Sequence, residues 1–439
     1  MAFKLPKLPG PSKSKHYAFD KNITVVKWEE LDAHHVIGRG QFGEVSKVTY
    51  QKQDIVMKRL LSEQEDDRRC YMKEVNIMSH LSHPNLITIK AVCPEKCAIL
   101  MEYMAFDFEV FGTKDVVSSL SEFLNLLDRT DTVDYFDFFP LVGQKVTEGL
   151  KYLHENTIAH RDLKPGNILV SNQHYCHSHD KQEIESIYKT DPILIKLCDF
   201  GESRSKMFHT NTILQTRTLG LGRGTPAFMA PEIRLDSDML PVGATMEDLM
   251  KADVWSLGMT LFAIINPSLK HPYEQNLKEA TGKRKLSSIL QENPKPDVKY
   301  KEKQETSWSS LLSAYKKCVL TQPIRRPNLE SVIQQLQVIP RSSTSNFGLP
   351  NSESDNDQLN TKNDVHANQP KTCSTFKQTS MGDCETRGPS TSGVLPSSKK
   401  KTRFSNNNVL DTDRSSASDF GLPNSESDDD QLYTRFVTS

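Results

Sequence analysis

A sharp change in composition near Pro340 limits the part of this chain that can build a core. Residues 341–439 contain no Ile and no Trp, and 29 of these 99 residues are Ser or Thr. Such a segment cannot bury enough apolar surface to offset the entropy of ordering its backbone. The composition therefore predicts a folded domain over residues 28–340, a basic, Pro-containing extension over residues 1–27 and a disordered Ser/Thr-rich tail over residues 341–439.

The predicted tail contains an internal repeat of 19 residues. Residues 341–359 read RSSTSNFGLPNSESDNDQL and residues 414–432 read RSSASDFGLPNSESDDDQL, so 16 of 19 positions are identical. Two copies so far apart cannot form a solenoid, which needs several stacked units. A duplicated docking motif for partners remains one interpretation. Disordered tails tolerate such duplications, which favours the other interpretation, a duplication without a role.

Charge, hydropathy and cysteine spacing exclude several classes of protein. The 55 Lys and Arg against 56 Asp and Glu leave a formal net charge of −1, so no basic field points to nucleic acid or a membrane surface. The longest apolar run, residues 257–265, has nine residues, far fewer than the roughly 20 of a membrane span. The N-terminus lacks the apolar core of a secretory signal. Eight Cys without framework spacing suit reduced thiols, so we expect a cytoplasmic or nuclear protein.

Within residues 25–340 the periodicity changes from strand-like to helical. Strand-like runs stand at residues 36–37, 45–50, 55–60, 86–92 and 97–103. A helical stretch at residues 68–81 interrupts them and carries Val75, Met78 and Leu81 on one face. Helical patterns then dominate, as in residues 138–156 and 252–265. The order predicts an α+β fold in two parts, a small β-rich one followed by a large, mainly helical one.

A glycine-rich loop reads GRGQFGEV over residues 38–45 and lies between two strand-like runs. Glycines let the backbone approach phosphates and present its N–H groups to them. A dinucleotide-binding turn would lead into a helix, whereas this loop continues into the alternating, β-branched residues 45–50. The pattern favours a β-hairpin over a nucleotide and disfavours a Rossmann fold. A glycine hairpin without a ligand is the alternative.

Two charged residues follow at positions suited to phosphate binding. Lys58 ends the apolar run of residues 55–57, which places its ammonium group on a strand beneath the loop. Glu74 stands in the helical stretch, from which its carboxylate could pair with Lys58 and hold the lysine toward the α- and β-phosphates. Taken alone, Glu74 would read as a solvated charge on a helix.

The most specific segment reads IAHRDLKPGNILV over residues 158–170. It sets Asp162, Lys164 and Asn167 in a loop between apolar flanks. Phosphoryl transfer needs a carboxylate at the incoming hydroxyl, a cation on the γ-phosphate and an oxygen ligand for Mg²⁺, and these residues supply one of each. Asp199, in the sequence DFG, offers a second Mg²⁺ ligand after an expected strand over residues 194–198. The sequences APE, DVWSLG and RRP follow at residues 230–232, 253–258 and 325–327.

In this order the motifs resemble those of the eukaryotic protein kinase family, over residues 28–339. The resemblance implies a bilobal kinase fold with a small β-rich N-lobe, a large helical C-lobe, and ATP and Mg²⁺ in the cleft between them. Asp162 would orient or deprotonate the substrate hydroxyl, with Lys164 and Asn167 beside it. Asn167 and Asp199 would be the Mg²⁺ ligands.

The resemblance also implies roles in nucleotide binding and in the framework of the fold. Met101 takes the gatekeeper position, and residues 102–104 take that of the hinge that bonds adenine. The implied nucleotide-binding residues are Ile37, Gly38, Gly40, Gly43, Val45, Val56, Lys58, Glu74, Met101, Glu102 and Met104. The implied framework residues are His160, Phe200 and Asp253, together with a buried Glu232–Arg326 ion pair.

The catalytic loop indicates the class of substrate. Lys164 in the sequence DLKPGN is similar to serine/threonine kinases, and Thr225 is placed to meet a Ser or Thr of a protein substrate. The subgroup that the chain resembles is the tyrosine-kinase-like one. A pseudokinase scaffold is the alternative, and the presence of all five residues at the family's key positions disfavours it. These residues are Lys58, Glu74, Asp162, Asn167 and Asp199.

Phosphorylation is expected in two regions of the chain. Arg161 brings a positive charge beside the segment between Asp199 and Glu232, where phosphate on a threonine could pair with it; ordinary polar loop residues are the alternative. The threonines concerned are Thr210, Thr212, Thr216 and Thr218. In the tail, Ser352, Ser354, Ser425 and Ser427 precede acidic residues, which suits modification by kinases that prefer acidic sequences.

Two features depart from the family's pattern. Val56 stands where the family usually has alanine over the adenine ring, so we expect a narrower pocket. The segment of residues 171–192 is longer than the family's short hairpin and contains His174, Cys176, His177 and His179. A Zn²⁺ site is one interpretation, but the spacing does not match the usual paired ligands. A solvated loop is the favoured one.

Overall fold

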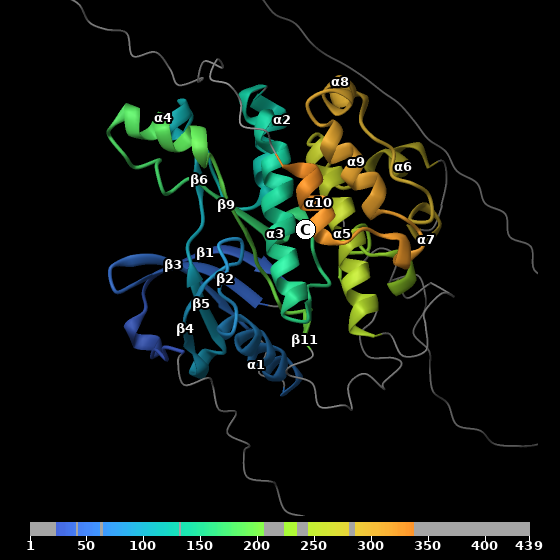
Figure 1. Cartoon of the computed structure of the whole chain (residues 1–439). Helices are drawn as coiled ribbons and strands as arrows, with labels where there is room; N and C mark the ends of the chain where they lie inside the picture. The colour runs from blue at the N-terminus through green and yellow to red at the C-terminus, as the bar shows by residue number, and fades with distance from the viewer. Residues whose placement is uncertain are drawn as a thin grey trace, which may run out of the picture. The chain divides into compact units, whose positions relative to one another are not determined.

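The computed structural model describes residues 23–40, 43–61, 65–130, 133–205, 224–234, 245–280 and 286–337 (Figure 1). Residues 1–22, the predicted tail and its repeat lie outside the described residues. The folded part begins a little before residue 28. The backbone N–H of Val26 donates to the carbonyl of Val92, and that of Val92 donates to the carbonyl of Thr24, both at 2.9 Å.

The β-rich part is an antiparallel sheet of five strands in the order β1-β2-β3-β5-β4. Alternate residues of β2 and β3 are buried, among them Val48, Ile55 and Met57, as expected for a sheet with one face on a core. Helix α1 adds Val75 and Ile77 to the core. The bounds are β1 Asp32–Gly40, β2 Gly43–Tyr50, β3 Gln53–Arg59, α1 Glu65–Ser79, β4 Ile89–Cys93 and β5 Ala98–Glu102.

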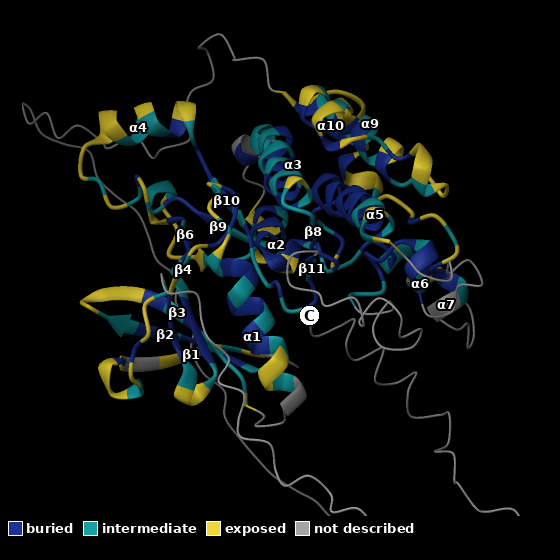
Figure 2. Cartoon of the chain, turned by 60° about the horizontal axis from the view of Figure 1, so that its bottom comes forward, coloured by how far each residue is buried: buried dark blue, intermediate teal, exposed yellow. Residues whose placement is uncertain are grey.

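The helical part is organised around α5, Met246–Ile265, which is buried along most of its length (Figure 2). A helix that is apolar on all sides needs neighbours on all sides; α3 and α9 pack against α5, and α10 packs against α3 and α9. Its start is fixed by a capping box in which Thr245 and Asp248 bond each other's backbone N–H. The other helices are α2 Leu120–Thr130, α3 Phe139–Glu155, α6 Glu274–Glu279, α7 Leu286–Ile289, α8 Lys301–Glu305, α9 Ser309–Cys318 and α10 Leu329–Leu336.

After β5, the described residues form three two-stranded ladders, and the loops of the candidate site leave two of them. Strand β8 pairs with β11, and β9 pairs with β10, so that residues 160–167 and 198–203 leave neighbouring strands. Strand β6 pairs with β7 just after the end of β5. The bounds are β6 Phe106–Asp107, β7 Val116–Val117, β8 Ile158–Ala159, β9 Ile168–Ser171, β10 Leu194–Leu197 and β11 Arg204–Ser205.

The segment of residues 171–192 contains a helix, so the expectation of a solvated loop holds only for residues 173–180, which form turns and expose His177 and His179. It contains helix α4, Lys181–Thr190, whose Asp180 cap accepts a hydrogen bond from the N–H of Gln182 at 2.8 Å. Tyr175 and Tyr188 are buried and join a cluster of aromatic rings. The other rings of this cluster come from residues 106–138, a part of the chain too distant for periodicity to reveal. The outer side of α4 is exposed (Figure 2).

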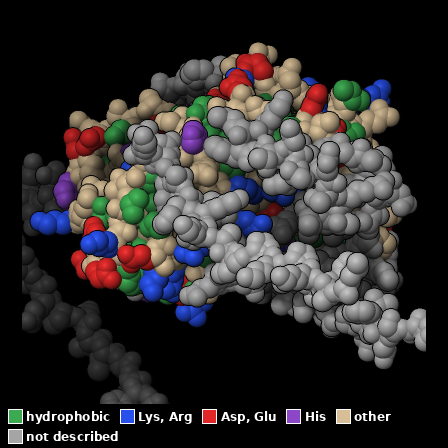
Figure 3. Space-filling model, turned by 90° about the horizontal axis from the view of Figure 1, so that it is seen from below, with side chains coloured by type: hydrophobic (Ala, Val, Ile, Leu, Met, Phe, Trp, Pro, Cys, Tyr) green, Lys and Arg blue, Asp and Glu red, His purple; other side chains and the backbone are tan. Residues whose placement is uncertain are grey.

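The α+β fold expected from the sequence is confirmed, with a small β-rich N-lobe and a larger, mainly helical C-lobe. Acidic and basic side chains are interspersed over the face shown in Figure 3, which agrees with the net charge of −1. Among the residues that the structure describes, no helix has the length and apolar content needed to cross a membrane.

Candidate active site

The glycine-rich loop joins β1 to β2 as a hairpin. Gly40 pairs with Gly43 at its tip, and Gly43 has a φ of +142°. A Cβ at Gly43 would lie 2.1 Å from the carbonyl oxygen of Arg59, so only glycine lets the hairpin approach β3 this closely. The Glu44 carboxylate accepts hydrogen bonds from Arg39 at 3.0 Å and Arg59 at 3.1 Å, which ties the loop to β3.

Beneath the hairpin, Lys58 joins residues from three separate elements. Its Nζ donates to Glu74 of α1 at 2.8 Å and to Asp199 at 2.7 Å. Burial opposes the charge of this lysine, yet the two carboxylates outweigh burial and raise its pKa. Burial likewise opposes the charge of Asp199, but Lys58 holds its pKa down at about 2. Lys58 and Asp199 therefore keep their charges at neutral pH, while burial raises the pKa of the Glu74 carboxyl.

The predicted adenine-side residues lie along β3 and β5. Val56 is paired with Met101 across the two strands. The Glu102 side chain bonds Lys196 of β10 at 2.7 Å and the N–H of Thr88 at 2.8 Å, so its carboxylate serves the framework. Met104 is buried in the core. Ile37 and Val45 lie on β1 and β2, and Ile37 is about half exposed, at 48%.

The loop after β8 brings the three predicted catalytic side chains together. Asp162 Oδ1 accepts hydrogen bonds from the N–H and the hydroxyl of Thr225, at 2.8 and 2.9 Å. Its Oδ2 accepts one from Asn167 Nδ2 at 2.9 Å. Lys164 Nζ lies 3.5 Å from the same Oδ2 and donates to the Thr225 hydroxyl at 2.6 Å. The carboxylate is thereby held in one orientation with a cation beside it.

The backbone of this loop is strained and fixed from α5. Arg161 and Asp199 have positive φ values, +71° and +64°, which non-glycine residues adopt at a cost. Asp253 offsets that cost by accepting the N–H groups of His160 and Arg161, both at 2.8 Å. His160 in turn bonds the carbonyl of Cys198 at 3.1 Å through Nε2. The catalytic loop and the strand before Asp199 are thus locked together.

The other expected ion pair is also present. Arg326 is bidentate to Glu232, with the Nη2–Oε2 bond at 2.8 Å, and both residues are buried. Arg326 further donates to the carbonyls of Leu320 and Lys251. The pair connects the end of the residue 224–234 segment to the turn before α10.

The arrangement of the donors fits a Mg²⁺-bound triphosphate. The amide nitrogen of Asn167 donates hydrogen bonds to Asp162, so its amide oxygen is left for a metal ion. This oxygen and the carboxylate of Asp199 are hard ligands of the kind that Mg²⁺ prefers. A Cβ on Gly38 would meet nothing within 4 Å, so the hairpin leaves open space at its first glycine.

One contact of the site could not be predicted from the sequence. Lys73, the residue before Glu74, donates from Nζ to the carbonyl of Gly201 at 2.9 Å. No motif in the sequence points to Lys73. The possible zinc ligands show no site: within the described residues no group of three or more His, Cys, Asp or Glu could hold a metal. Thr210, Thr212, Thr216 and Thr218 lie outside the described residues.

Comparison with known proteins agrees with this geometry. The family model described as "Protein kinase domain" matches residues 31–337. "Serine/threonine-protein kinase 4 homolog B" of Dictyostelium discoideum is 29% identical over 70% of this chain and 22% of its own length. Human "Mitogen-activated protein kinase kinase kinase 7" is 22% identical over 71% of this chain and 42% of its own. "Serine/threonine-protein kinase STY46" of Arabidopsis thaliana is 26% identical over 73% and 46%. The match therefore spans less than half the length of each of these relatives.

Proposed function

Because the chain belongs to the protein kinase family, we propose that it transfers the γ-phosphoryl group of ATP to serine and threonine hydroxyls of proteins. The observation that carries this proposal is the position of Asp162, held by Thr225 and Asn167 with Lys164 beside it. Three of the similar proteins named above are themselves called kinases, two of them serine/threonine kinases.

Each side chain has a part in the proposed reaction. Asp162 orients the incoming hydroxyl and accepts its proton as the hydroxyl oxygen bonds the γ-phosphorus and the bond to the β-phosphate oxygen breaks, releasing ADP. Lys164 balances negative charge on the γ-phosphate, and Lys58 positions the α- and β-phosphates. Mg²⁺, held by Asn167 and Asp199, would neutralise charge on the phosphates.

Thr225 supports the choice of serine and threonine over tyrosine. The Thr225 hydroxyl bonds both Asp162 and Lys164. Thr225 therefore occupies part of the space beside the Asp162 carboxylate and leaves room there for a short hydroxyl side chain of a substrate. A role in signalling is part of the same proposal. Partners that dock on the tail repeat remain a prediction from the sequence.

The alternative of a catalytically silent scaffold is disfavoured by the intact polar network. A pseudokinase would need neither the Asp162 carboxylate held by Thr225 nor the contacts of Lys58 with Glu74 and Asp199. All of these contacts are made in this chain. Keeping several buried charges has a cost in desolvation, which a scaffold would have no reason to bear.

Two substitutions test the proposal. Asp162→Asn keeps the hydrogen-bonding shape but loses the carboxylate, so we expect ATP binding to persist while phosphoryl transfer falls by a factor of about 10² to 10⁴. Asp199→Ala removes a metal ligand, so we expect weaker Mg²⁺-ATP binding itself. Transfer to a peptide library and ATP affinity would be measured for both purified proteins. Near-full turnover by Asp162→Asn would show that the catalytic loop is wrongly assigned.

A further inference from the structure

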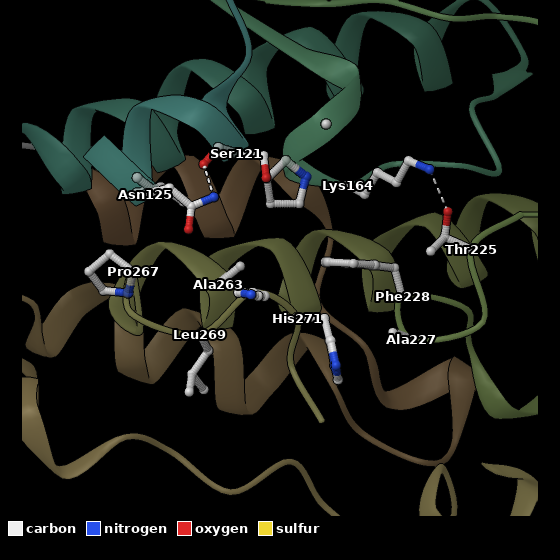
Figure 4. Close-up of a pocket in the computed structure, with 14 residues that line it drawn as sticks. Ser121, Asn125, Lys164, Thr225, Ala227, Phe228, Ala263, Pro267, Leu269 and His271 are labelled. Carbon is white, nitrogen blue, oxygen red and sulfur yellow. Dashed lines mark hydrogen bonds between the residues drawn. The ribbon is translucent and has the colours of Figure 1, made fainter. Parts of the chain in front are cut away.

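A pocket opens beside Lys164 and Thr225, two residues that contact the Asp162 carboxylate (Figure 4). We call it the acceptor-side pocket. It lies between the start of α2, the turn after Lys164, the chain after Thr225 and the chain that follows α5. Most of its wall is apolar: Leu124, Pro165, Phe228, Ala263, Pro267 and Leu269. Its cavity volume of about 50 Å³ suits the end of one side chain.

The pocket is within reach of a residue close to the phosphorylated one. Lys164 and Thr225, which line it, both contact Asp162, where the acceptor hydroxyl must lie. An extended peptide advances about 3.3 Å per residue. A side chain two or three residues from the acceptor, at about 7 to 10 Å along the peptide, can therefore enter the pocket.

The charges around the pocket disfavour a basic substrate side chain. None of the residues that line it is Asp or Glu, whereas Lys164 and Lys270 are cations. The nearby carboxylate of Glu274 is engaged by the N–H of Lys270 and by the Lys278 side chain. A Lys or Arg placed in the pocket would lose its hydration and meet no carboxylate on the pocket wall. An apolar side chain has no such penalty and gains burial.

The chain itself carries a sequence that meets these requirements, twice. Residues 349–353 and 422–426 both read LPNSE, with Leu and Pro three and two residues before a serine. Proline limits its own φ to values near −65°, which favours the extended backbone that a peptide needs along a cleft.

We propose that the acceptor-side pocket selects serines preceded by a Leu-Pro pair, and that Ser352 and Ser425 of this chain's own repeat are such substrates. The pocket binds the Leu side chain, the proline keeps the backbone extended, and the serine hydroxyl is thereby set at Asp162. The proposal rests on the kinase activity proposed above. It gives the 19-residue repeat a role as a duplicated phosphorylation site.

The first test uses peptides and the full-length protein. The parent peptide spans residues 346–358 with Ser354→Ala, so that Ser352 is its one hydroxyl acceptor. We expect Leu349→Ala to lower kcat/KM about tenfold, which is the usual scale for emptying an apolar subsite, and Leu349→Arg to lower it further. Equal kcat/KM for the parent and Leu349→Ala peptides would overturn the assignment. A degenerate peptide library serves as the reference substrate. If the library is phosphorylated and the parent peptide is not, this inference alone is overturned. If no peptide is phosphorylated, the proposed activity is overturned as well.

The second test changes the pocket. Ser121 lies at the start of α2, lines the pocket and is outside the loop that carries Asp162. Ser121→Glu places a carboxylate at the wall, and we expect it to reverse the preference, so that the Leu349→Arg peptide becomes better than the parent. Ser121→Gln is the matched control for size without charge and should keep the order of the unsubstituted protein. The same peptide ranking in all three proteins would refute the pocket assignment.

Discussion

Lys73 Nζ donates a hydrogen bond to the carbonyl oxygen of Gly201 at 2.9 Å, joining α1 to the chain just after Asp199. The next residue of α1, Glu74, reaches Asp199 through Lys58. Two consecutive side chains of one helix therefore hold both ends of residues 199–201. Any shift of α1 has to move the proposed metal-binding carboxylate with it.

The first prediction concerns this bond. Lys73→Met should lower kcat/KM by about tenfold or more, since a hydrogen bond from a charged group contributes about 1.5 to 3 kcal/mol. Lys73→Arg should recover part of the loss. Peptide phosphorylation at varied ATP concentration is the measurement, with the exposed Lys90→Met on β4 as control. If Lys73→Met matched Lys90→Met, the bond would have no part in placing Asp199.

The second prediction is a pH dependence of stability. Burial, together with the nearby Arg204, lowers the pKa of Lys73 from 10.5 to about 8. Between these values the unfolded chain keeps a proton on Lys73 that the folded chain has released. The free energy of unfolding should therefore rise with pH from about 8 to 10 in the unsubstituted protein, relative to Lys73→Met. Urea unfolding of both proteins across this range checks it; a constant or falling difference would contradict the lowered pKa.

The third prediction concerns the buried pair of Arg326 and Glu232. Arg326→Met leaves the Glu232 carboxylate buried without its partner, so the free energy of unfolding should fall by about 3 to 5 kcal/mol. The exposed Lys316→Met on α9 is the control and should change it by less than about 0.5 kcal/mol. Adding Glu232→Leu to Arg326→Met should recover part of the loss. Chemical unfolding of the three variants measures this, and an Arg326→Met protein as stable as the control would be the contrary result.

Much of the site could be predicted because its chemistry is local in sequence. Asp162, Lys164 and Asn167 fall within six positions, and a loop that short brings them together in almost any fold. The Lys58–Glu74 contact followed from placing one on a strand and the other on the next helix. The Lys73–Gly201 bond joins residues 128 positions apart and uses a backbone carbonyl, which no residue pattern reports. Helix α4 was missed because Tyr175 and Tyr188 are buried by rings from residues 106–138.

The fourth prediction concerns regulation through residues 206–223, which lie outside the described residues. Arg161 is buried, and its side chain reaches the carbonyl of Glu202, at the edge of that segment. A phosphate of about −1.5 to −2 charge on a nearby threonine would pair with it and raise activity. Phosphatase treatment should therefore lower turnover, with mass spectrometry locating the phosphate on Thr210, Thr212, Thr216 or Thr218. Undiminished turnover by enzyme free of phosphate over residues 203–225 would refute this.

The fifth prediction concerns the tail. Every contact of the site described above comes from residues 23–337, so removing residues 341–439 should leave the turnover of a saturating short peptide within about twofold of the full chain. Steady-state kinetics of the truncated and full-length proteins on one library-derived peptide provide the comparison. A large drop on truncation would mean that the tail supports the active conformation.

Asn172 fixes where the chain can bend between the two lobes. Its side chain bonds both the N–H and the carbonyl of Asp107, at 2.8 Å each, and its own N–H reaches the carbonyl of Ala105. Residues 105–107 are thereby held against the chain just after β9. On the other side, β5 keeps the chain in the sheet up to Glu102. Only Tyr103 and Met104 lie between the end of β5 and Ala105, so we expect any rotation of the backbone between the sheet and the helical part to be concentrated in these two residues.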